Sequence, residues 1–67
     1  MAVDDRRVLR EAAGELRRGE RFEEVLGRVL RRHEGSYEDY VRLITDVRER
    51  ANKKNLTPAQ AARDLAG

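Results

Sequence analysis

Acidic and basic side chains in this chain are gathered in short clusters of alternating sign. Three acidic clusters are each followed by a basic pair: Asp4-Asp5 by Arg17-Arg18, Glu20-Glu23-Glu24 by Arg31-Arg32, and Glu38-Asp39 by Lys53-Lys54. A helix dipole favours acids at the N-terminus and bases at the C-terminus. The clusters therefore predict three successive helices, and most of the charge is explained by folding without any ligand.

The apolar residues repeat at helical spacing between these clusters. Intervals of three and four residues predict helices over about 5–18, 20–33 and 37–53, each with an apolar face. Gly19 and Gly35 are placed to end the first two helices in the left-handed conformation, and Asn55 to end the third. Gly27 lies off the apolar face of the second helix, where it either admits a close neighbour or has no special role.

A fourth, shorter helix is predicted over about 58–66. Thr57 suits the N-cap, Pro58 the first helical position, and Gln60 completes a capping box. No alternating strand pattern is present, so the predicted fold class is all-α: one domain, 1–67, forming a compact three-helix bundle with the fourth helix packed on the third. The predicted core consists of Leu9, Ala12, Leu16, Phe22, Val25, Leu26, Val29, Leu30, Tyr40, Val41, Ile44, Val47, Leu56 and Leu65.

Composition narrows the functional classes. Charged residues make up 42% of the chain, but the net charge is only +2, which gives little general attraction for nucleic acid or anionic membranes. With no cysteine and a single histidine, His33, we expect neither a metal nor a cofactor. The sequence contains no bilayer-spanning apolar run and no signal peptide, so we expect a cytoplasmic protein that does not bind membranes.

Catalysis is not expected. Most carboxylates lie in the first turns of helices or four residues before a base, where they form ordinary surface pairs. A chain of 67 residues has too small a core to enclose a substrate pocket, so no small-molecule ligand is expected. We interpret His33 as a partly buried helix-end residue near Tyr37 or Tyr40, in preference to a pH-sensitive contact or a catalytic imidazole.

The leading functional interpretation concerns the helix over 37–53. Its apolar arc is roughly 160° wide, which is more than a short fourth helix is expected to cover. Tyr37, Tyr40 and Leu43 are the candidate partner surface on this arc. They favour a non-enzymatic module that binds a protein partner or a second copy of itself.

Two alternatives remain open. The outer face of the first predicted helix carries a candidate nucleic-acid surface made of Arg6, Arg7, Arg10, Gly14, Arg17 and Arg18. Glu11 and Glu15 lie along one edge of this face and reduce its net charge, so the same residues also suit a solvated surface. The second alternative is a chain whose purpose is stability or folding itself, natural or designed, with no ligand.

The last twelve residues invite comparison with a known motif. The segment 56–67 resembles the first helix of the helix-turn-helix motif of bacterial regulators, through Thr57, the alanine pair at 61–62, Leu65 and Gly67. That motif requires a recognition helix after the glycine, which these residues do not include. The helix over 37–53 would bring acids against DNA phosphates, so we assign no DNA-contacting residue there and no family.

Overall fold

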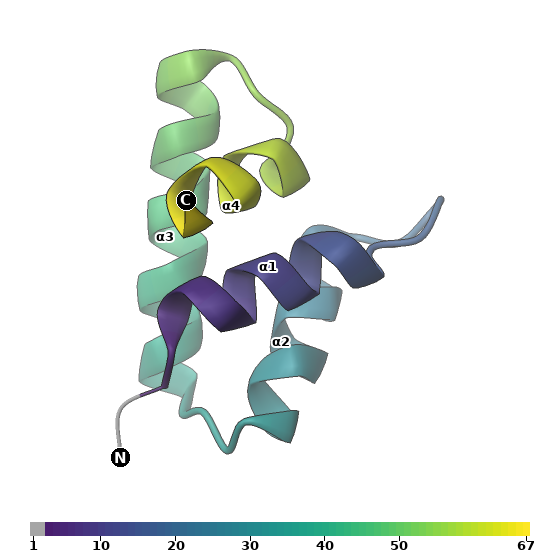
Figure 1. The fold of residues 1–67 in the computed structure, drawn as a ribbon, viewed down its shortest axis with the longest axis vertical. Helices are drawn as coiled ribbons and strands as arrows, with labels where there is room; N and C mark the ends of the chain where they lie inside the picture. The colour runs from purple at the N-terminus through teal and green to yellow at the C-terminus, as the bar shows by residue number, and fades with distance from the viewer. Residues whose placement is uncertain (1–2) are drawn as a thin grey trace.

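The computed structural model describes residues 3–67, and four helices make up this part of the chain (Figure 1). Their bounds are α1 Asp5–Glu15, α2 Phe22–Arg32, α3 Tyr37–Lys54 and α4 Pro58–Ala66. Residues 3–67 contain no strand, which confirms the predicted all-α class. The bounds of α3 and α4 agree with the prediction to within one residue, whereas α1 and α2 are shorter than predicted.

Side-chain caps begin three of the four helices, and the one predicted at Thr57 is confirmed. Asp4 accepts a hydrogen bond from the Arg7 backbone N–H at 3.2 Å and caps α1. Ser36 and Thr57 form complete capping boxes at the starts of α3 and α4. Each such cap stabilises the fold by about 1 kcal/mol, which matters in a domain with so small a core.

α1 ends at Glu15, three residues before its predicted end. Leu16 is extended, and the chain then makes a tight turn in which the Glu20 N–H donates to the Arg17 carbonyl at 3.0 Å. Gly19 supplies the left-handed residue of that turn, with φ of 89°. The prediction that Gly19 ends a helix is therefore wrong. Gly19 lies in the turn after α1, and a hydrogen bond from the Arg17 N–H to the Glu20 carboxylate stabilises this turn.

α2 ends in a Schellman motif whose left-handed residue is Glu34, not Gly35. The Glu34 N–H donates to the Arg31 carbonyl at 3.2 Å, and the Gly35 N–H to the Leu30 carbonyl at 2.8 Å. Gly35 is required for a different reason, because a Cβ there would lie 2.6 Å from Leu30 Cδ2. The prediction for Asn55 is confirmed, since it ends α3 with φ of 56°.

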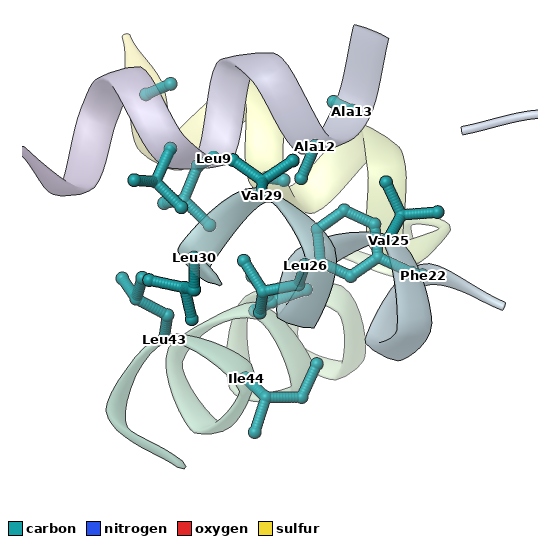
Figure 2. Packing of buried hydrophobic residues seen from close by; sticks show 14 of the residues in the cluster. Leu9, Ala12, Ala13, Phe22, Val25, Leu26, Val29, Leu30, Leu43 and Ile44 are labelled. Carbon is teal, nitrogen blue, oxygen red and sulfur yellow. The ribbon is translucent and has the colours of Figure 1, made fainter. Parts of the chain in front are cut away.

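Buried side chains from all four helices form one core. α2 contributes its complete predicted apolar face: Phe22, Val25, Leu26, Val29 and Leu30. Figure 2 shows these side chains filling the space between α1 and α3. Six buried residues were missing from the predicted core. Two are large, Val8 and Leu43, which are 0% and 1% exposed, and the other four are the alanines Ala13, Ala61, Ala62 and Ala66.

The core prediction is wrong for Val41, which is 42% exposed. The inward face of α3 is formed by Leu43, Ile44 and Val47. Val41 lies on the opposite side from Leu43, because two residues turn a helix by roughly 200°. Four other predicted core residues are half-buried at the edge of the core: Leu16, Tyr40, Leu56 and Leu65.

α4 packs against α1 as well as α3, whereas the sequence indicated only α3 as its neighbour. Figure 1 shows α4 lying across α3 and beside α1. The buried residues that α4 contributes are alanines, and α1 also carries a buried pair of them: Ala61, Ala62 and Ala66 on α4, and Ala12 and Ala13 on α1. Side chains this small allow two helix backbones to approach closely.

Polar contacts join α4 to both neighbours. The Arg63 guanidinium donates to the Ala13 carbonyl in the last turn of α1 at 3.4 Å. Asp64 is bound by Arg50 and by Lys54, the latter at 3.0 Å, both on α3. These two cations lower the pKa of the Asp64 carboxyl group, so it is charged at neutral pH.

Candidate binding surfaces

The candidate partner surface is an open groove between α2 and the start of α3. It has a volume of about 290 Å³ and is lined by Gly27, Leu30, Arg31, Gly35, Ser36, Tyr37 and Tyr40. We call it the tyrosine groove. The rings of Tyr37 and Tyr40 stack on one another, with centroids 6.1 Å apart and planes inclined by 22°. Tyr37 is 78% exposed, and Tyr40 is half-buried beneath it.

Local signals in the chain place these two rings. The Schellman motif at the end of α2 leads directly into the Ser36 cap, so α3 begins beside the last turn of α2. Tyr37 is the first residue of α3, and Tyr40 lies three residues later on the same face. Gly35 has no side chain, which leaves Leu30 free to line the groove.

Gly27 resolves an alternative that the sequence left open. It lies within α2 and lines the groove, and no atom of another helix lies within 4 Å of the position that a Cβ would occupy. No neighbouring helix therefore requires a glycine at this position. Glycine inside a helix costs about 1 kcal/mol relative to alanine. The missing side chain instead leaves space at the floor of the tyrosine groove.

Leu43 does not belong to this surface. It was grouped with the tyrosines because all three lie on the wide apolar arc of α3, but the structure buries it in the core at 1% exposure. Val41 is the exposed aliphatic residue of this region instead. The spacing offers a signal for it, because Tyr37 and Val41 are four residues apart and lie on one face of a helix.

The tyrosine groove has one charged lining residue, Arg31. Its side chain is exposed, and it forms no ion pair with any acid among residues 3–67. Nearby, Glu23 of α2 and Arg48 of α3 form an ion pair with a separation of 3.6 Å. Burial raises the pKa of the Tyr40 phenol, so this ring is neutral at physiological pH.

The second candidate surface is only partly helical. Arg6, Arg7, Arg10 and Gly14 lie on the exposed side of α1, whereas Arg17 and Arg18 lie in the turn after it. We call these six residues the arginine face. All six are exposed, and none of the five arginines forms an ion pair within the described residues.

The acids beside the arginine face are bound to α2. His33 Nε2 lies 2.6 Å from Glu11 Oε2, and Arg32 pairs with Glu15. The hydrogen bond from Arg32 lowers the pKa of the Glu15 carboxyl group, which is therefore charged at neutral pH. The expectation of a partly buried His33 at a helix end is confirmed, but its polar partner is Glu11 and not a tyrosine.

Gly14 borders a hollow of about 560 Å³ whose charged lining residues are of both signs. The acids among them are Glu15 and Glu20. The Arg17 backbone N–H lowers the pKa of the Glu20 carboxyl group, so both acids are charged. Arg17 and Arg28 also line this hollow, so a phosphate entering it would meet two acids and two arginines, with no excess of positive charge. Within the arginine face, the stretch from Arg6 to Arg10 suits an anion better than the end near Gly14.

Within residues 3–67, no helix is both long enough and apolar enough to cross a membrane. The same residues contain no group of three or more acidic or histidine side chains arranged to hold a metal ion. Comparison with protein families, curated proteins and solved structures finds no match to this chain.

Proposed function

We propose that this protein is a non-enzymatic binding module that holds a segment of a protein partner in the tyrosine groove. The observation that supports this most directly is the exposure of Tyr37, a residue that is 78% exposed although its ring stacks on Tyr40 at the capped start of α3. An aromatic ring held in place in this way offers a large contact area at little cost in conformational entropy. Such rings often dominate the binding energy of protein interfaces.

The size of the groove favours a short segment over a broad interface. A standard protein interface buries roughly 800 Å² on each partner. The whole molecule exposes 4905 Å², so an interface of that size would cover about a sixth of it. Seven residues line the groove, which suits one or two apolar side chains of a partner segment.

Replacing Tyr37 with alanine is expected to weaken the binding of groove ligands. The test uses a library of random twelve-residue peptides displayed on phage and selected on the immobilised protein. Peptides retained by the wild type should lose at least tenfold in affinity for Tyr37→Ala, because a buried aromatic contact contributes more than about 1.4 kcal/mol. The chain has two tyrosines and no tryptophan, and both tyrosines line the groove, so tyrosine ring signals in NMR report binding there directly.

A matched control is available on the same helix. Thr45 is exposed on α3 and does not line the groove, so Thr45→Ala should bind the selected peptides like the wild type. Peptides that bind Tyr37→Ala as well as wild type would contradict the proposal. A dimer of the free protein that disappears in Tyr37→Ala would identify a second copy as the occupant.

A second candidate function rests on the unpaired arginines of the arginine face. Their neighbours Glu11 and Glu15 are bound to α2, so five exposed guanidinium groups remain for phosphates. Replacing Arg6, Arg10 and Arg17 with glutamine should abolish low-salt binding of a DNA duplex or single-stranded RNA. The wild type should show NMR shifts over residues 6–18 that fade with salt, because each phosphate contact releases counterions.

The control variant for this experiment removes the same number of positive charges from positions outside the arginine face. Arg21, Arg31 and Lys53 are exposed and make no ion pairs among residues 3–67, so their triple glutamine variant should still bind. Binding that does not depend on salt, or no binding at all, would exclude the nucleic-acid function. If the peptide selection also fails, the remaining interpretation is a chain without a ligand.

A further inference from the structure

We infer that the tyrosine groove selects a partner segment that carries a carboxylate beside its apolar anchor. The inference rests on the proposed function and specifies the chemistry of the partner. The residue that carries it is Arg31, the one charged side chain among those lining the groove. A guanidinium group binds a carboxylate through two parallel hydrogen bonds, which gives both affinity and orientation.

Arg31 differs from the other arginines of α2 in having no acidic partner. Arg28 pairs with Glu20 at 3.3 Å, and Arg32 pairs with Glu15. Those two arginines connect α2 to α1 and to the turn after it. Arg31 is exposed and forms no ion pair within the described part of the chain. Its positive charge is therefore available to a ligand.

The position of Arg31 allows it to contact both parts of such a ligand. It follows Gly27 by four residues, so the two lie on the same face of α2 and both line the groove. The aliphatic stem of an arginine can cover apolar surface while its guanidinium stays in water. A side chain seated between Gly27 and the tyrosine rings would thus lie along the stem, with a neighbouring carboxylate at the guanidinium.

The charges flanking the groove favour a single carboxylate over a nucleic acid. Glu34 and Glu38 stand on either side of the lining residues 35–37; both are exposed, and neither forms an ion pair within residues 3–67. A continuous phosphate backbone would pass these acids and be repelled. A peptide can place one carboxylate at Arg31 and neutral residues beside the two glutamates.

The peptide selection tests this inference when it is repeated on charge variants. Peptides selected on the wild type should be enriched in aspartate or glutamate at one position next to an aromatic or large aliphatic residue. Their affinity for Arg31→Gln should fall about tenfold, because a charge-assisted hydrogen bond is lost. Selection on Arg31→Glu should enrich lysine or arginine at the same position. Arg18→Glu, which alters an exposed, unpaired arginine outside the groove, should keep the acidic preference.

The outcomes separate the inference from the proposed function. Tyr37-dependent peptides without an acidic preference, bound equally by Arg31→Gln, would overturn the inference and leave the protein-binding function intact. Absence of any Tyr37-dependent peptide would overturn both. An oligouridine that binds through Tyr37 more tightly than any selected peptide would replace the peptide with a nucleic acid. Circular dichroism melts of each variant verify that it is folded.

Discussion

Replacing Leu43 with alanine is expected to lower the free energy of unfolding by about 3 kcal/mol, the usual cost of truncating a buried leucine. The Leu43 side chain is 1% exposed and lies on the inward face of α3 with Ile44 and Val47. Small domains have a free energy of unfolding of only about 5 kcal/mol or slightly more, so the variant should lose most of its stability. Urea denaturation followed by circular dichroism measures the change.

Tyr37→Ala provides the comparison for this experiment. Tyr37 precedes Leu43 by six residues on the same helix, but it is 78% exposed. Its removal should cost less than about 1 kcal/mol, as is usual for surface substitutions. A costly Tyr37→Ala with a neutral Leu43→Ala would mean that α3 is rotated differently, and the tyrosine groove would then not exist in this form.

Replacing Ala62 with leucine is expected to destabilise the fold by about 3 kcal/mol, at the upper end of the range for overpacking. Ala62 is 0% exposed on α4, a helix that packs against both α1 and α3. The larger side chain has no space unless α4 moves away from these neighbours. Hydrogen exchange should therefore show lost protection in α4 and the last turn of α1, with α2 retaining more of its own.

Ala59→Leu is the matched control on the same helix. Ala59 is half-buried and borders a hollow of about 350 Å³ that is also lined by Phe22 and Thr57. A leucine fits there, so the free energy of unfolding should change by less than about 1 kcal/mol. Equal, small effects of both substitutions would show that the contact of α4 with its neighbours is loose.

The sequence predicted the parts of the fold that depend on local signals. The capping box at Thr57 placed the start of α4 correctly, because a side chain and a backbone N–H three residues away define it. The apolar face of α2 was also predicted completely. The apolar residues of α2 are regularly spaced, so one orientation of the helix about its axis buries all of them.

Features that depend on distant parts of the chain were harder to predict. The packing of α4 on α1 depends on buried alanines. Alanine has little apolar surface, so its spacing along the sequence only weakly indicates which face of a helix is buried. The rotation of α3 decides that Leu43 is buried and Val41 exposed, and this follows from where the other helices pack. The early end of α1 depends on a hydrogen bond from the Arg17 N–H to Glu20 in the turn.

The candidate site also has a part that could be predicted from local sequence and a part that depends on the fold. Tyr37 and Tyr40 could be chosen from the width of the apolar arc of α3 alone. Arg31 could not be chosen from the sequence, because the sequence does not show whether an acidic side chain of the same chain pairs with it. Only the fold shows that Glu15 and Glu20 are bound by other arginines and that Glu23 is bound by Arg48.

The contact between α1 and α4 also bears on the order in which the molecule folds. The hydrogen bond from Arg63 to Ala13 joins residues 50 positions apart, whereas α1 to α2 and α2 to α3 are connected by short turns. Contacts between distant residues carry a larger loop-closure entropy and form more slowly than local ones. We therefore expect α2 to associate with α1 and α3 first, and docking of α4 to complete the folding reaction.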